Sequence, residues 1–578
     1  MPRLTARIAL VIAMAIPLHP ASSQAQTLDP AKQSPTVLMQ GPADGVAYHA
    51  LRERARALVA ARKDAEAEPL LKQIARDYPR DGINWVRLAS VEKRLGKWRE
   101  AAEAYERAGP LVGWTSWYTP RLNAAASRLA AGDKAGALAL LRKEIRSDRS
   151  LHRQSLYDDA DYAALRDDPE FRALVGRPDT KGWSRNDGWR RDVDYLYAEV
   201  ARTSQDYAGR LLPAAFTRRY EQLKRDVPRL SDEAIFVGMN RMLAVLHQGH
   251  TSLFRPTGSR YLPIQLYAFP EGLFIIHASD AHAALVGSRV LAFGSMPTDT
   301  VLRRLGETRS VDGDMQHLWL TSELAATYHL KGIGAITRVD TVPVSVQDAR
   351  GETRTVALAT MSEAPPRRQD KLVAPRSVPA PLFLRDLTQN HWEQALPEHD
   401  AMYVQFNNVL DDGNETLPAF GKRLWTVLSA NPPANLILDL RHNNGGNTGL
   451  YPELLRTVIA FSRTPGHRIY ALIGRRTYSA TANFITDLER LATPIWVGEA
   501  SSECCNFHGD ASHVVLPFSR IEGEISTVRW NLSQNVFDGR REMSPDVPVQ
   551  LTAGAYFAGR DLALEAVFRL IQESRASR

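Results

Sequence analysis

The sequence predicts a multidomain α/β protein, and three observations lead to that fold class. The chain has 578 residues, of which 44% are hydrophobic and 24% charged, values typical of globular proteins with large cores. Its first third is rich in helix-forming residues whose apolar positions recur with helical spacing. Its last third alternates continuous apolar runs with amphipathic segments, which is the pattern of a sheet covered by helices.

The N-terminus predicts a signal peptide over residues 1–26. Two early arginines precede an apolar run from Ile8 to Leu18, and small residues follow at Ser23 and Ala25. The run is shorter than the about 20 residues that a membrane-spanning helix needs. We therefore expect an exported protein, periplasmic or secreted, without a stable membrane anchor.

Charge and cysteine content exclude several other classes of protein. The net charge of +7 comes from basic residues that are mostly arginine and spread along the chain, so we expect no nucleic-acid partner. The two cysteines, Cys504 and Cys505, are adjacent and provide neither a disulfide framework nor the ligand spacing of a zinc site. We expect no metal and no organic cofactor. A vicinal disulfide between the two cysteines stays open.

Residues 40–178 carry an internal helical repeat. The apolar and small residues that recur are Leu51, Ala55, Ala67, Leu71 and Ile74 in one copy and Trp85, Leu88, Ala89, Ala101, Tyr105 and Ala108 in the next. Their period of about 34 residues resembles that of tetratricopeptide repeats. That resemblance implies a concave surface for a protein partner. A generic alanine-rich helical bundle is the alternative.

Residues 180–257 predict a helical segment that ends in a glycine-containing loop. Ser231 is a typical N-cap for the amphipathic helix that follows it. After that helix, the loop places His250 between Gly249 and Thr251. On its own, a histidine in such a loop is more often structural than catalytic.

Residues 258–348 change to short strands and predict a small β-rich domain. The stretch 285–305 resembles the late half of a PDZ domain, in which a glycine turn, a strand, a turn and a helix follow one another. The resemblance implies capture of extended peptides at a sheet edge, and a β-rich domain without a ligand is the alternative. Residues 349–398 are interrupted by prolines and predict a linker or strap.

The core domain is expected over residues 399–578. Its apolar run 435–440 suits a parallel strand buried on both faces. Gly445 and Gly446 follow this strand, where the backbone can approach a ligand closely and an N–H group can face an oxyanion. A simple tight turn is the alternative.

Ser479 stands between a strand-like run and an amphipathic helix. At a helix N-terminus the positive end of the helix dipole favours a developing negative charge, and the N–H of Ala480 would be a second oxyanion donor. The alternative is that Ser479 or Thr477 only caps the helix.

A serine nucleophile needs a base. The last lysine of the chain is Lys422, so a Ser–Lys dyad with its lysine after Ser479 is excluded by composition. A histidine base remains, and His250 is the candidate. The other histidines near the core are His442, His508 and His513.

Several stretches together resemble the tail-specific, or C-terminal-processing, serine peptidases, and within them the tricorn-core and retinoid-binding-module branch. The matching stretches are LILDLRHNNGG at 436–446, TYSATANFITDLER at 477–490, VGE at 497–499, PDVPVQLT at 545–552 and the GHTS loop at 249–252. The resemblance covers about residues 180–575 and leaves the repeat region outside.

The resemblance implies a crotonase-like α/β core in which Ser479 is the nucleophile and His250 takes its proton. It also implies that the oxyanion donors are the N–H groups of Gly445 or Gly446 and of Ala480. An acidic residue late in the core assists this branch. The candidates for it are Asp538, with Glu499 and Glu542 as competitors.

These features predict an exported serine peptidase that cleaves peptide bonds of peptide or protein substrates through an acyl-enzyme. Two alternatives stay open. One is a non-catalytic scaffold that binds peptides or apolar ligands, and the other is a serine esterase on the same core.

Overall fold

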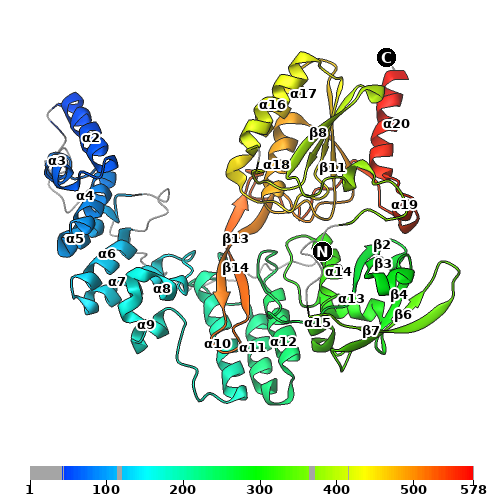
Figure 1. Cartoon of the computed structure of the whole chain (residues 1–578), viewed down its shortest axis with the longest axis horizontal. Coiled ribbons are helices and arrows are strands. Elements are labelled where there is room, and N and C mark those ends of the chain that lie inside the picture. The colour runs from blue at the N-terminus through cyan, green and yellow to red at the C-terminus, as the bar shows by residue number, and fades with distance from the viewer. Residues whose placement is uncertain (1–41, 43, 113–119, 363–371, 414, 577–578) are drawn as a thin grey trace, which may run out of the picture. The chain divides into compact units, whose positions relative to one another are not determined.

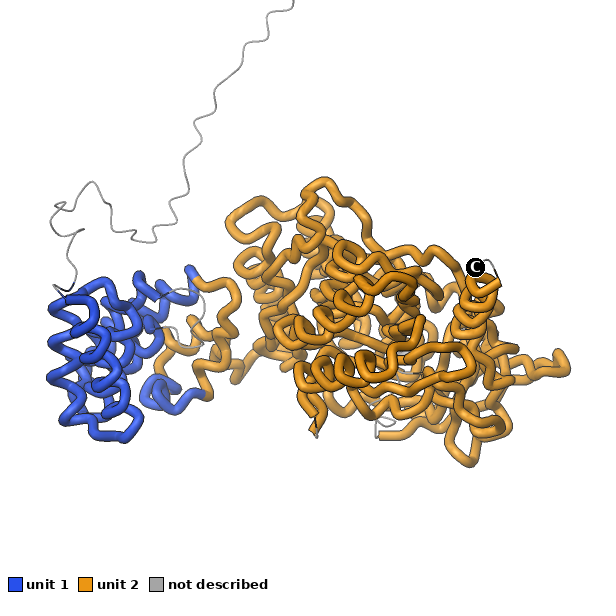
Figure 2. The backbone as a smooth tube through the Cα atoms, turned by 90° about the horizontal axis from the view of Figure 1, so that it is seen from above, with its two compact units in different colours: residues 1–147, 159–166 blue, residues 148–158, 167–578 orange. Residues whose placement is uncertain are grey.

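The chain forms two compact units in a computed structural model that describes residues 42, 44–112, 120–362, 372–413 and 415–576 (Figure 2). One unit comprises residues up to 147 together with 159–166, and the other comprises 148–158 together with 167–578. The predicted signal peptide lies outside the described residues. No helix in the described part of the chain is long and apolar enough to cross a membrane.

The first unit is a succession of helices in which each helix packs against the next. Small residues at the contacts, such as Ala55, Ala67 and Ala89, are fully buried and let the helix axes approach closely. The tetratricopeptide assignment stays a prediction. The helices are α2 (Gly45–Ala60), α3 (Asp64–Asp77), α4 (Gly82–Arg94), α5 (Trp98–Ala108), α6 (Pro120–Ala130) and α7 (Lys134–Ser147), followed by the 3₁₀ turn η2 (Ala160–Leu165).

The second unit begins with helices, as the sequence predicts. The side chain of Ser231 accepts a hydrogen bond from the Ala234 N–H, which confirms the predicted N-cap. The apolar face of the helix that follows is buried against the β-rich domain. The helices are α8 (Ser155–Asp158), α9 (Pro169–Leu174), α10 (Arg185–Thr203), α11 (Ala214–Asp226) and α12 (Asp232–Ala244).

An antiparallel sheet follows, with strand order β2-β3-β4-β6-β7 and with β5 paired to β4 (Figure 1). Its PDZ-like character stays a prediction. The strands are β2 (Ile264–Phe269), β3 (Gly272–Ala278), β4 (Arg289–Phe293), β5 (Met296–Pro297), β6 (Thr341–Gln347) and β7 (Thr353–Ala359). The helical elements between them include α13 (Thr298–Gly306), η5 (Asp314–Trp319), α14 (Leu320–Glu323) and α15 (Thr327–Gly332).

The core domain is a six-stranded sheet of order β15-β12-β11-β10-β9-β8, parallel except for the edge strand β8. Alternate residues of its strands point to opposite faces. Leu436 and Leu438 pack with one group of helices, whereas Ile437 packs with α20 on the other face. The strands are β8 (His391–Leu396), β9 (Ala401–Phe406), β10 (Asn435–Asp439), β11 (Arg468–Ile473), β12 (Ile495–Gly498) and β15 (Val547–Pro548). The helices are α16 (Leu417–Ala430), α17 (Pro452–Ser462), α18 (Ala480–Ala492), α19 (Ala553–Phe557) and α20 (Leu562–Ala576).

The expected linker over residues 349–398 is shorter than the sequence predicts. Strand β7 pairs with β6, so the β-rich domain extends to residue 359. Strand β8 pairs antiparallel with β9, so the core begins before residue 399. The prolines that suggested a linker lie between these two strands, partly outside the described residues.

A long hairpin connects the core domain to the helical segment (Figure 1). Its strands β13 (Asn506–Val515) and β14 (Glu522–Asn531) form a three-stranded sheet with β1 (Ser252–Leu253). The carboxylate of Asp192, on α10, accepts hydrogen bonds from two backbone N–H groups at the tip of the hairpin, at 2.7 and 2.8 Å. The hairpin therefore brings the loop that contains His250 to the core domain.

A buried ion cluster joins the sheet to the last helix. Arg441, just after β10, donates to Asp439 at 3.0 Å and makes two hydrogen bonds of 2.8 Å to Asp561, which also caps α20. The side chain of Asp561 is only 7% exposed. Removal of one partner from such a cluster leaves a charge buried without compensation.

We expect Asp561→Ala to lower the free energy of unfolding by about 3–5 kcal/mol because Arg441 loses two of its charged hydrogen bonds. The matched control is Glu565→Ala on α20, which removes an exposed ion pair with Arg560 and should cost less than about 1 kcal/mol. Denaturant unfolding of both variants measures the difference. Equal losses would contradict the importance of the buried cluster.

Candidate active site

Ser479 lies at the turn from β11 into α18 in an unusual backbone conformation, with φ 57° and ψ −125°. A residue with a side chain rarely adopts these angles, so the turn is strained. Its hydroxyl makes no capping hydrogen bond to the helix, which removes the cap as an explanation for this serine. Thr477 stabilises the turn instead, since its Oγ1 donates to the Leu440 carbonyl at 2.9 Å and accepts from the Gly474 N–H at 3.1 Å.

His250 and Ser479 are adjacent in the structure. The distance between His250 Nε2 and Ser479 Oγ is 3.1 Å, within hydrogen-bonding range. Two contacts on either side of the histidine hold its loop: Gly249 N–H donates to Asp312 Oδ2 at 2.6 Å, and Thr251 Oγ1 accepts from Ser526 N–H at 2.9 Å. The second contact comes from β14, the strand that pairs with β1.

Tyr478 and Glu503 lie at the other nitrogen of the His250 ring. The tyrosine ring stacks on the imidazole, with centroids 4.6 Å apart, and its Oη lies 2.9 Å from Nδ1. Glu503 Oε1 lies 3.5 Å from the same nitrogen. Burial lowers the pKa of His250 to about 4. The imidazole is therefore neutral near pH 7 and can accept a proton.

Glu503 is a buried carboxylate beside His250 that the sequence analysis did not single out. Its side chain is fully buried, and it accepts hydrogen bonds from Ser479 N–H at 3.0 Å and Gln316 Nε2 at 3.2 Å. Burial raises the pKa of Glu503 well above its usual value, and the nearby Asp312 raises it further. The signal in the sequence was a lone charge in the otherwise uncharged run 500–505.

His508 lies between the carboxylates of Asp312 and Asp206, and it does not contact Ser479. Its Nδ1 lies 2.8 Å from Asp312 Oδ1 and its Nε2 lies 2.8 Å from Asp206 Oδ2. Burial opposes a charge on His508, but the two carboxylates outweigh burial and raise its pKa to about 9. His508 is therefore an imidazolium near pH 7 and is not available as a base.

The other two histidines that the sequence left open also lie elsewhere. His442 stacks on Phe383, with ring centroids 5.8 Å apart, and His513 stacks edge-on against His152 at 4.8 Å. Within the described residues, neither of them contacts Ser479.

The three acidic candidates from the sequence are placed away from His250. Asp538 lies in the loop after β14 and accepts hydrogen bonds from Arg540 at 3.1 and 2.9 Å. Glu499 is bound by Arg475 at 2.7 and 2.8 Å. No contact among the described residues joins Asp538, Glu499 or Glu542 to His250. The structure thus places Glu503, and not Asp538, beside His250, because Arg540 holds Asp538 in its own loop.

The predicted oxyanion donors differ in whether their N–H groups are already hydrogen-bonded. Gly445 N–H donates to Asn443 Oδ1 at 3.1 Å, so that group is already used. In the described part of the chain, the N–H groups of Gly446 and Ala480 donate to no other protein group. Gly445 has φ 95°, and a Cβ atom there would lie 2.6 Å from Ser479 Cβ and 2.8 Å from Ala480 N. A glycine is required at this point because the serine turn packs directly against the backbone.

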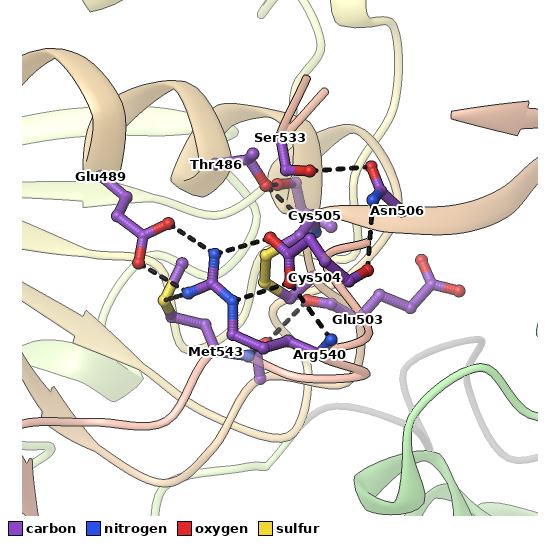
Figure 3. Close-up of a disulfide and its surroundings, with 12 residues drawn as sticks. Thr486, Glu489, Glu503, Cys504, Cys505, Asn506, Ser533, Arg540 and Met543 are labelled. Carbon is purple, nitrogen blue, oxygen red and sulfur yellow. Dashed lines mark hydrogen bonds and ion pairs between the residues drawn. A yellow bond between two sulfur atoms is a disulfide. The ribbon is translucent and has the colours of Figure 1, made fainter. Parts of the chain in front are cut away.

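Cys504 and Cys505 form a vicinal disulfide directly after Glu503, and both are fully buried (Figure 3). Cys505 N–H donates to Thr486 Oγ1 at 3.1 Å. Thr486 belongs to α18, the helix that begins next to Ser479. The loop that carries Glu503 is thus attached to the same helix as the serine.

Comparisons with known proteins find similar solved structures only. No protein-family model and no curated protein matches the sequence. Mature CPAF has a TM-score of 0.49 and 13% identity, covering 67% of this chain and 97% of that chain. The photosystem II D1 C-terminal processing protease has 0.32 and 14%, covering 66% and 97%. The tricorn protease has 0.34 and 13%, covering 68% and 37%.

We expect Gly445→Ala to disrupt the serine turn, since the added methyl group collides with backbone atoms that have no room to move. Reaction of Ser479 with a fluorophosphonate probe should slow by about 100-fold or more, the size of effect seen when an oxyanion contact is lost. The control is Gly554→Ala, where a Cβ meets nothing within 4 Å. Normal labelling of Gly445→Ala would show that the turn tolerates a side chain.

Proposed function

We propose that this protein is an exported serine peptidase in which His250 activates Ser479. The observation that carries the proposal is the 3.1 Å distance between His250 Nε2 and Ser479 Oγ, at a serine held in a strained turn between strand and helix. The sequence resemblance to tail-specific peptidases supports the choice of peptide bonds as substrate.

In the proposed reaction, Ser479 Oγ attacks a peptide carbonyl carbon while its proton moves to His250 Nε2. The imidazolium then gives this proton to the departing amine as the C–N bond breaks, which leaves an acyl-serine. Water, deprotonated by the same imidazole, attacks the acyl carbon and releases the carboxylic acid. We assign the N–H groups of Gly446 and Ala480 to the oxyanion of both tetrahedral intermediates.

Glu503 and Tyr478 take the positioning role that a triad requires. For Nε2 to accept the serine proton, the resting proton of the neutral ring must be on Nδ1. That nitrogen faces Tyr478 Oη at 2.9 Å and Glu503 Oε1 at 3.5 Å, both of which can accept from it. An imidazolium formed at this distance also favours the carboxylate form of Glu503, and the pair stabilises the charge that develops on His250.

We further propose that the repeat helices and the PDZ-like sheet deliver substrate to this site. The repeat helices of the first unit would bind a protein partner, and the PDZ-like sheet would bind an extended peptide. Export follows from the predicted signal peptide.

We expect Ser479→Ala to abolish both fluorophosphonate labelling and peptide hydrolysis. The probe reacts only with an activated serine, so labelling of the natural protein separates an enzyme from a binding scaffold. A panel of peptides and esters then separates a peptidase from an esterase. Absence of labelling at Ser479 in the folded natural protein would contradict the proposal.

We expect Glu503→Gln to lower kcat by about 10²–10⁴-fold, because the loss of charge removes the group that orients and stabilises His250. Asp538→Asn is the matched control and should retain activity near that of the natural protein, since Asp538 contacts Arg540 and not His250. Steady-state kinetics on a peptide substrate measures both. A large loss in Asp538→Asn with little loss in Glu503→Gln would return the acidic role to Asp538.

A further inference from the structure

A second feature of the site is a group of donor atoms at the Nδ1 side of His250. Ligand atoms of His250, Asp312 and Glu503 all lie within 4.8 Å of one another. His250 Nδ1 and Glu503 Oε1 are 3.5 Å apart. Neighbouring ligands of a tetrahedral zinc ion, with bonds of about 2.0–2.1 Å, are separated by about 3.4 Å. The two atoms are therefore already separated by the distance expected between two ligands of one zinc ion.

Gln316 adds a fourth donor that the protein itself does not use. Its side chain is fully buried, and its Oε1 accepts no hydrogen bond within the described residues. Its Nε2 donates to Ser502 O at 3.1 Å and Glu503 Oε1 at 3.2 Å, which fixes the amide orientation. A buried carbonyl oxygen without a donor is unfavourable, and such an oxygen commonly faces water or an ion.

The side-chain oxygens converge on one place, the surface of Gly249. A methyl group placed on this glycine would lie 2.7 Å from Glu503 Oε1, 2.8 Å from Gln316 Oε1 and 2.9 Å from Asp312 Oδ2. A side chain at this position would collide with all three oxygens, so their close approach beside the histidine requires glycine. Asp312 is also held from behind, because His508 Nδ1 lies 2.8 Å from its other oxygen, in the manner of a partner that orients a metal ligand.

We propose that His250 Nδ1, Asp312, Glu503 and Gln316 Oε1 form an inhibitory site for one Zn²⁺ ion. An imidazole nitrogen combined with two carboxylates suits Zn²⁺, whereas Ca²⁺ and Mg²⁺ prefer shells made of oxygen alone. The inhibition, but not the binding, rests on the proposed peptidase function.

Zinc bound at Nδ1 would inhibit the reaction of Ser479 because it fixes the hydrogen of the His250 ring on Nε2. A neutral imidazole that binds a metal through Nδ1 carries its hydrogen on Nε2. That hydrogen would point at Ser479 Oγ, so Nε2 could not accept the serine proton. The ion would also bind the Glu503 carboxylate, which could then no longer accept a hydrogen bond from Nδ1. The base would be lost without any change at the nucleophile.

Binding is tested on Ser479→Ala, which needs no activity. Calorimetry with Zn²⁺ and visible absorbance with Co²⁺ should each give one site per chain. Asp312→Asn and Gln316→Leu, each made in this background, should bind at least tenfold more weakly. The control is His513→Gln, which removes a histidine near the exposed carboxylate of Glu522 and should leave binding unchanged. Circular dichroism establishes that each variant is folded, and the two ligand variants test the site independently.

Inhibition is tested on the natural protein with the fluorophosphonate probe. Zn²⁺ should slow labelling of Ser479, a chelator should restore it, and the inhibitory concentration should rise at least tenfold in Gln316→Leu. Absence of zinc binding, or equal binding in Asp312→Asn, Gln316→Leu and the control, would overturn the proposal. Zinc binding with the expected ligand dependence in a natural protein that never labels would instead refute the peptidase function and leave the metal site standing.

Discussion

The geometry around Ser479 depends on a short antiparallel pairing between strands distant in the sequence. Ser252 pairs with Glu524 and Leu253 with Gly523, so the chain is held against the hairpin two residues after His250. The other strand of the hairpin begins at Asn506, three residues after Glu503. One small sheet therefore positions both His250 and the buried carboxylate, while Ser479 is supplied by the separate parallel sheet of the core.

The strained serine turn is stable because contacts hold it from several sides. Thr477 bonds to the neighbouring strand end, Glu503 accepts the backbone N–H of Ser479, and Gly445 packs against the turn without a side chain. Such strain persists only where the surroundings determine the conformation. Glu503 thus makes two contacts, since the same carboxylate that faces His250 also accepts the backbone N–H of Ser479.

The charge of Asp312 influences Glu503, which contacts the serine turn. The carboxylate of Asp312 is close enough to raise the pKa of Glu503, and Asp312 in turn is hydrogen-bonded to His508. This buried acidity helps the imidazole when it becomes positive during the proposed reaction. In the proposed metal site, an ion at Nδ1 would compete for the same groups. Activity and metal inhibition would then be two results of one charge arrangement.

The sequence by itself determined the local elements and the residue types with chemistry. Apolar periodicity indicated the repeat helices and the buried strand after Asn435, and the cap at Ser231 needed only neighbouring residues. The absence of lysine after Lys422 directed attention to histidine as the base. Only the tertiary structure decided that Glu503 faces His250, that Arg540 holds Asp538 and that Gly445 has its N–H already bonded. The physical reason is that periodicity and capping act over a few residues, whereas the partner of a buried carboxylate is set by strand pairing across more than 200 residues.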